Sequence, residues 1–113
     1  MAFLPEKTYI EETLVSGYSL NSGPTSFQSS DISRYNTISF QINASSITGI
    51  NRFKVEQSSD GLNWVPLKDI LYELETGCGS LVVEKSSFSG KYVRFNITDT
   101  TTGTISVLLI CKR

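Results

Sequence analysis

Residues 36–42 read NTISFQI, an unbroken alternation of polar and apolar side chains. Successive side chains of a β-strand point to opposite faces, so Ile38, Phe40 and Ile42 share one face of a half-buried strand. The same alternation returns at residues 52–56, 92–97 and 104–107. Strands of this kind, spaced about 8–12 residues apart, predict an all-β fold: an antiparallel β-sandwich or jelly roll of about seven or eight strands.

The length of 113 residues supports one domain with one hydrophobic core. We assign residues 9–113 to a single β-sandwich domain and residues 1–8 to an N-terminal arm. The first residues lack the basic and long apolar regions of a secretory signal. No apolar run approaches the ~20 residues of a membrane-spanning helix. The sequence therefore predicts a protein without a membrane span.

Turn residues divide the chain into strands and connections. The pair Asp60-Gly61 suits the positive-φ positions of a tight hairpin, which would join a strand at 50–58 to a partner at 63–67. Two short strands are expected around a turn at 76–79, and the last two strands are expected to pair as a closing hairpin. The predicted strands are residues 9–15, 35–43, 50–58, 63–67, 70–74, 80–84, 91–98 and 104–112, with a loop at 21–26.

The residue types that most catalytic and metal sites need are missing or scattered. The chain contains no histidine, which excludes histidine-based nucleophilic triads and most zinc sites. Its carboxylates show no spacing that acid–base catalysis or calcium binding requires. The formal net charge is −1, with no basic cluster to follow a nucleic-acid backbone. We therefore expect a non-enzyme with no catalytic residues, cofactor, metal site or nucleic-acid partner.

The two cysteines, Cys78 and Cys111, are too few to build a disulfide-dependent fold. Cys78 lies in a Gly-Cys-Gly segment and Cys111 lies near the chain end, and no Cys-x-x-Cys motif is present. The sequence favours two free thiols and leaves a Cys78–Cys111 pair open.

Four segments together resemble a known group of proteins. They are residues 31–39, the SxDGxxW hairpin within 53–67, the KYVR strand within 89–97, and the TGTISV strand at 102–107. This series is similar to small discoidin-like β-sandwich or jelly-roll modules of phage and prophage virion structural proteins, over residues 31–111. The resemblance implies a virion protein: a capsid decoration, vertex, spike or tail component that contacts other virion proteins and copies of itself.

The last strand departs from the alternation and predicts an interface. Leu108 and Ile110 are apolar on the face that should be polar, and a strand that is apolar on both faces must be covered on both. The cover could be the N-terminal arm, with Phe3 and Leu4, or a neighbouring subunit. Phe3, Leu4, Leu108 and Ile110 are therefore the candidate subunit interface.

A second function is a carbohydrate-binding module that recognises a host-surface glycan. Sugar rings stack on exposed aromatic faces that polar groups surround. The candidate glycan contacts are Tyr35 and Trp64, although Trp64 also suits packing at its own hairpin or filling the core. A third function, a small cytoplasmic inhibitor or adaptor, has no motif in its favour.

Overall fold

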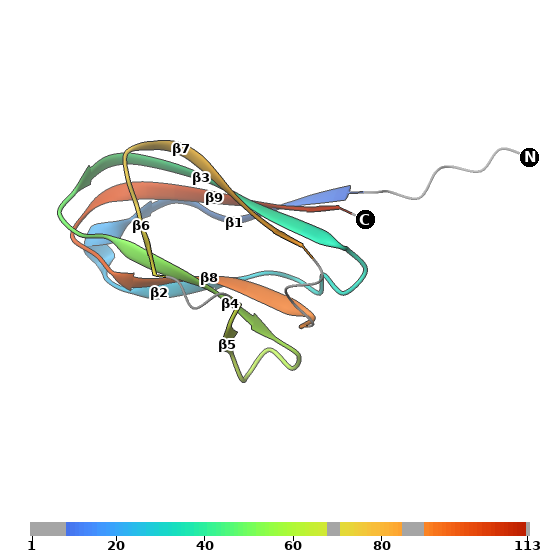
Figure 1. Ribbon diagram of the computed structural model, residues 1–113. Helices are drawn as coiled ribbons and strands as arrows, with labels where there is room; N and C mark the ends of the chain where they lie inside the picture. Colours follow the sequence, from blue (N-terminus) through green and yellow to red (C-terminus); the bar gives the residue numbers. More distant parts are fainter. Residues whose placement is uncertain (1–8, 68–70, 85–89, 113) are drawn as a thin grey trace, which may run out of the picture.

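The computed structural model describes residues 9–67, 71–84 and 90–112. These residues form two antiparallel sheets packed face to face (Figure 1). The strands are β1 (Tyr9–Ser19), β2 (Thr25–Gln28), β3 (Thr37–Thr48), β4 (Arg52–Ser58), β5 (Val65–Pro66), β6 (Tyr72–Glu73), β7 (Gly77–Glu84), β8 (Tyr92–Asp99) and β9 (Thr102–Lys112). A short 3-10 helix, η1 (Leu20–Ser22), connects β1 to β2.

The strand order is that of a jelly roll. The four-stranded sheet has the order β1-β9-β3-β7, and the five-stranded sheet has the order β2-β8-β4-β5, with β6 also pairing with β4. Along the chain, successive strands cross from one sheet to the other, except for β4, β5 and β6. This crossing pattern is how a jelly roll closes two sheets around one core. The predicted all-β, antiparallel sandwich is confirmed.

The predicted closing hairpin is wrong. Only Thr100 and Thr101 separate β8 from β9, yet β8 pairs with β2 and β4, while β9 pairs with β1 and β3. A short connection between two strands does not require them to share hydrogen bonds. Here it carries the chain from one sheet to the other, because each strand buries its apolar face from the opposite side of the core.

Three further boundaries differ from the prediction. The predicted turn at 76–79 instead begins β7, whose Gly77 pairs with Ala44 of β3. The predicted loop at 21–26 contains η1 and the start of β2, which pairs with β8 along the edge of the five-stranded sheet. Strand β3 runs on to Thr48, because its small polar residues still pair with β9.

The Asp-Gly hairpin exists but is wider than predicted. Strand β4 ends at Ser58 and β5 begins at Val65, so the loop spans residues 59–64. The Asp60 carboxylate organises this loop: its Oδ1 accepts hydrogen bonds from the backbone N–H groups of Asn63 and Leu62, each at 2.8 Å. These bonds, led by the Asn63 backbone, hold the pKa of Asp60 well below its usual value. Gly61, with φ of 77°, completes the turn.

Four aromatic rings connect the two sheets through the core. Phe95 of β8 is fully buried and stacks on Phe53 of β4, with ring centroids 4.2 Å apart. Phe40 of β3 lies 6.2 Å from Phe95 across the sandwich, and Tyr72 of β6 stacks on the other side of Phe53 at 5.1 Å. Aliphatic side chains fill the space around these rings. They are Leu20, Ile32, Ile38, Val55, Leu67, Leu74, Val93, Ile97, Ile105, Val107 and Leu109.

A buried amide ties two inter-sheet connections together at one end of the sandwich. Asn51, between β3 and β4, is 1% exposed. Its Nδ2 donates to the Thr48 carbonyl at 3.0 Å and to the Thr101 hydroxyl at 3.2 Å, and its Oδ1 accepts from the Thr101 N–H at 2.7 Å. The Asn51 backbone carbonyl also accepts from Leu74 N–H at 2.7 Å. One residue thus ties the connection that precedes β4 to the connection that precedes β9.

Replacing Asn51 with Ala should lower the free energy of unfolding by about 1–3 kcal/mol, because the buried amide and its hydrogen bonds to Thr48 and Thr101 are lost. Urea denaturation followed by circular dichroism measures the change. The matched control is Asn21→Ala, at an exposed position of η1, which should change stability by less than about 0.5 kcal/mol. Equal effects of the two substitutions would contradict a structural role for this amide.

Candidate functional site

The outer face of the four-stranded sheet carries the apolar side chains that the last strand predicted. Ile110 of β9 lies in one cross-strand row with Glu11, Ser39 and Val82. Leu108 lies in the next row, with Thr13 and Gln41. Val82 of β7 is 55% exposed, whereas Leu108 and Ile110 are half-buried. We call this surface the outer apolar face.

The third row of this face holds Ser106, Asn43 and Cys78. Across the three rows, Glu11 on β1 is the only charged residue among the described side chains. Two shallow hollows of about 290 and 320 Å³ lie between the rows, and both include Gln41 and Cys78 in their lining. Interface cores are depleted of charge in this way, whereas an ordinary solvated sheet face carries many charged residues.

The described residues do not bury Leu108 and Ile110 completely, so the face still has room for a cover. The inward neighbours on the same strand, Val107 and Leu109, are at most 1% exposed, as predicted. Phe3 and Leu4, the other half of the predicted interface, lie outside the described residues. Whether the arm or a second subunit covers the face stays a prediction.

Trp64 lies on the outer face of the five-stranded sheet rather than in the core. It is half-buried, and the guanidinium carbon of Arg94 lies 4.5 Å from the centre of its ring. The Arg94 Nε donates to the Glu56 carboxylate at 2.8 Å, and Asn96 Nδ2 donates to the same oxygen at 2.9 Å. This arrangement fixes the hairpin against β8 by a cation–π contact. It also covers part of the aromatic surface that a sugar would need.

Tyr35 does not join Trp64 in a glycan site. It is 9% exposed and belongs to the core cluster, in the connection before β3, where its N–H donates to the Ile32 carbonyl at 3.1 Å. A buried ring offers no face for sugar stacking. The glycan hypothesis therefore rests on Trp64 alone, and for that residue it stays a prediction.

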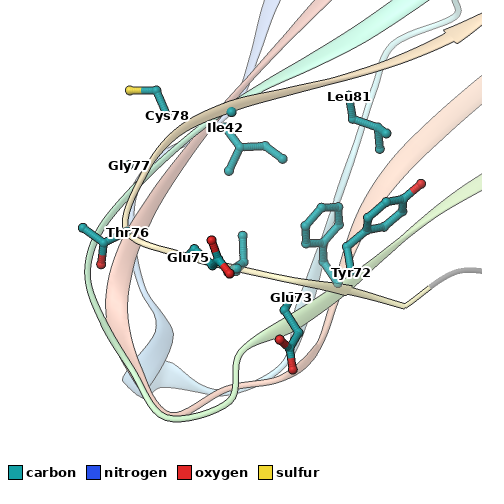
Figure 2. A pocket seen from close by; sticks show the side chains of 11 residues that line it. Ile42, Tyr72, Glu73, Glu75, Thr76, Gly77, Cys78 and Leu81 are labelled. Carbon is teal, nitrogen blue, oxygen red and sulfur yellow. The ribbon is translucent and has the colours of Figure 1, made fainter.

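A pocket of about 290 Å³ opens between the two sheets at the start of β7 (Figure 2). Ile42 and Leu81 extend into it from the four-stranded sheet, and Tyr72 faces them from the other side. Glu73, Glu75 and Thr76 line its rim. Both carboxylates are exposed. We call this space the inter-sheet pocket.

Sequence reasoning missed the inter-sheet pocket and the contribution of Val82. The pocket is assembled from β3, β4, β6 and β7, which are far apart in the sequence. Its one local signal is the pair Gly77-x-Gly79, which we interpreted as part of a turn. Glycines at every second position of a strand leave one face without side chains. That pattern could have indicated an unfilled space on the core-facing side of β7.

The two cysteines are both free and occupy different environments. Cys78 is exposed on the outer apolar face, and Cys111 is fully buried in the core. Burial, and to a smaller extent the negative charge of Glu12, raises the pKa of the Cys111 thiol to about 12. The two thiols do not pair in this structure.

The described part of the chain contains no group of three or more Cys, Asp or Glu side chains that could hold a metal ion. Within the same ranges, no helix is long and apolar enough to cross a membrane.

No protein-family model matches this chain, and no curated protein sequence matches it. The solved structures that resemble it in fold include the following two. One is the crystal structure of the SPBc2 prophage-derived protein YomS, with a TM-score of 0.66 and 11% sequence identity over 100% of both chains. The other comes from Bacillus endospore appendages, described as a novel family of disulfide-linked pili. Its TM-score is 0.58 and its identity 13%, covering 99% of this chain and 94% of that one.

At such low identity the likeness establishes the fold alone. This chain therefore shares its fold with a prophage-derived protein and with a chain of the endospore appendages.

Proposed function

We propose that this chain is a structural subunit of a phage or prophage particle: a jelly-roll protein that decorates a capsid or completes a vertex, spike or tail. It acts by contacting copies of itself and other virion proteins through the outer apolar face. The fold likeness to a prophage-derived protein and to a pilus subunit supports an assembled structure.

One observation carries the proposal. The outer apolar face has one charged residue in three rows and presents Val82, Leu108 and Ile110 toward solvent. Full burial of an exposed aliphatic side chain is worth about 1.5–3 kcal/mol, and completing the burial of a half-buried side chain contributes part of this free energy. Symmetric assembly requires only a complementary apolar patch with few charges to desolvate.

The protein works by binding rather than by catalysis in this proposal. The outer apolar face and the inter-sheet pocket are lined mainly by apolar and uncharged side chains. Such surfaces suit the exclusion of water between subunits. The chain contributes no histidine to serve as a general base at neutral pH.

Replacing Ile110 with Asp should weaken self-association at least tenfold while the domain remains folded, because a carboxylate would be desolvated at the interface. Analytical ultracentrifugation of the full chain measures association, and circular dichroism verifies folding. The matched control is Ser26→Asp, an exposed position on the outer face of the five-stranded sheet. It adds the same charge and should leave association unchanged.

Two results would overturn the proposal. One is a wild-type chain that stays monomeric at high micromolar concentration and is absent, by mass spectrometry, from phage-like particles purified from the organism that encodes it. The other is an Ile110→Asp variant that associates as the wild type does.

A further inference from the structure

The inter-sheet pocket is an unfilled apolar space in a domain whose core is otherwise closely packed. Ile42, Phe53, Tyr72, Leu74 and Leu81 supply its apolar lining. Protein interiors normally leave few voids larger than a water molecule. A space of about 290 Å³ is close in size to the smaller ligand-binding clefts of proteins. This end of the sandwich is therefore built to receive an apolar group.

Two glycines of β7 keep the pocket open. Gly77 and Gly79 pair with Ala44 and Ile42, whose side chains face the core. Cys78 between them pairs with the exposed Asn43, and its side chain points to the other face of β7 (Figure 2). A Cβ added at either glycine would meet no atom within 4 Å. Gly77 has φ of 130°, which side chains rarely adopt, but Gly79 lies outside the left-handed region. The backbone at Gly79 could thus carry a side chain, and its absence leaves the space empty.

The start of β1, which residues 1–8 precede, and the inter-sheet pocket lie toward opposite ends of the sandwich. Strand β1 begins at Tyr9, in register with Lys112 and, through it, with Thr37 at the start of β3. The pocket lies farther along β3, at Ile42, beside the β6–β7 connection at the other end of Figure 1. Within one chain, the start of β1 and the inter-sheet pocket are separated by about 17 Å along the direction of β3. Across the sheet they are separated by three strand spacings, about 14 Å.

Residues 1–8 precede β1, and a chain of that length spans about 27 Å when extended. Reaching its own pocket would require this arm to reverse direction immediately before β1 and cross the whole sheet. A second copy placed end to end would meet the arm without a reversal, because β1 runs away from its arm and toward the pocket end.

We propose that the inter-sheet pocket receives the Phe3-Leu4-Pro5 segment of a second copy of this chain, which joins copies head to tail. This inference rests on the proposed function and specifies one contact of the assembly. The apolar segment matches the apolar lining. In an extended arm, Phe3, Pro5 and Lys7 fall on one side, and Leu4 and Glu6 on the other. With Phe3 in the pocket, Lys7 faces the rim that carries the Glu73 and Glu75 carboxylates. A head-to-tail contact of this kind repeats into a ring or a filament.

The sharpest test fills the pocket from within. Gly79→Val places a β-branched side chain at a strand position with open space around it, so the domain should fold with an unchanged or higher melting temperature. Head-to-tail association, measured by sedimentation velocity on the full chain in the Ile110→Asp background so that the outer apolar face does not contribute, should weaken at least tenfold, as expected when burial of an aromatic or aliphatic side chain is lost. Gly79→Ala is the matched control: its single methyl group leaves most of the pocket open and should preserve association.

The reciprocal variant changes the arm. Phe3→Ser combined with Leu4→Ser keeps the pocket and should lose head-to-tail association to the same extent as Gly79→Val. In the Ile110→Asp background, which removes association through the outer apolar face, an equimolar mixture of the two variants should form a 1:1 heterodimer in native mass spectrometry, because one variant offers an intact arm and the other an intact pocket. Neither variant alone should form this arm–pocket pair.

Specific outcomes would overturn the inference without touching the proposed function. Association of both variants at wild-type strength, or a mixture that forms no heterodimer, would exclude the arm as the occupant of the pocket. If Ile110→Asp still disrupts assembly in that case, the outer apolar face remains the interface and only the arm–pocket contact is wrong. Loss of folding in Gly79→Val, seen by circular dichroism, would contradict the open space on which the inference depends.

Discussion

Replacing Phe95 with Ala should lower the free energy of unfolding by about 3–5 kcal/mol, the range for deleting a buried aromatic ring. Phe95 is fully buried and contacts both sheets, stacking on Phe53 at 4.2 Å and facing Phe40 at 6.2 Å. Its removal leaves a cavity between the two sheets, because the remaining strands keep the sheets at their present separation. Because small domains are stable by only about 5–15 kcal/mol, this single change should bring the protein close to its unfolding threshold.

Urea denaturation, read from the far-ultraviolet circular dichroism signal, measures the effect of Phe95→Ala. Phe27→Ala is the matched control, since Phe27 is half-buried on the edge strand β2 and directly opposite Phe95 in register. Phe27 packs edge-on against Tyr18, with centroids 5.3 Å apart, so it should cost clearly less than Phe95. Equal losses from the two variants would contradict the view that the rings of Phe40, Phe95 and Phe53 form the centre of the core.

The strands with strict alternation could be predicted because their burial is decided by their own sequence. Ile38 and Phe40 of β3 are fully buried, and Phe53 and Val55 of β4 are at most 4% exposed, as the period of two requires. Strand β2 was missed because Phe27 is its one apolar residue, and its neighbours have the composition of a loop. Pairing with β8, rather than its own pattern, makes this segment a strand.

Turn signals predicted the pairing of β4 with β5 at the Asp60-Gly61 hairpin, but they did not predict the partners of β9. The two-residue connection before β9 has the appearance of a hairpin, yet it crosses the core. Tertiary contacts decide that the chain crosses here. Strand β9 is central in the four-stranded sheet, between β1 and β3. The buried Asn51 amide holds the connection by its hydrogen bonds to Thr101. Such long-range competition between partners leaves little trace in local sequence.

The candidate interface was predictable only in part. Leu108 and Ile110 were indicated because they interrupt the alternation of β9, a signal that any single strand can give. Val82 of β7 joins them solely through the register of three strands, and the inter-sheet pocket depends on residues from four strands. The residues of a surface that several strands build can be recognised only once the order and register of those strands are known.

Alkylation with iodoacetamide at pH 8 should modify one thiol of the folded protein quickly and leave the other almost unmodified. Cys111 is fully buried, and its pKa is raised from the usual 9.0 to about 12 by burial and by the charge of Glu12. Only the thiolate reacts, so a shift of this size lowers its reactive fraction about a thousandfold relative to an ordinary thiol. Cys78, exposed on the outer apolar face, should carry the label, as peptide mass spectrometry would show.

The direction of the pH dependence separates a shifted pKa from simple occlusion of Cys111. A thiol with a raised pKa gains thiolate about tenfold per pH unit until the pH approaches that pKa. Its slow alkylation should therefore keep accelerating about tenfold per pH unit from pH 8 to pH 10, whereas the alkylation of an ordinary thiol would level off above pH 9. Cys78→Ser should remove the fast labelling and leave the slow labelling intact, and both thiols of the urea-unfolded chain should react alike. Rapid labelling of Cys111 in the folded protein at pH 8 would show that β9 opens to solvent, contrary to its central position between β1 and β3.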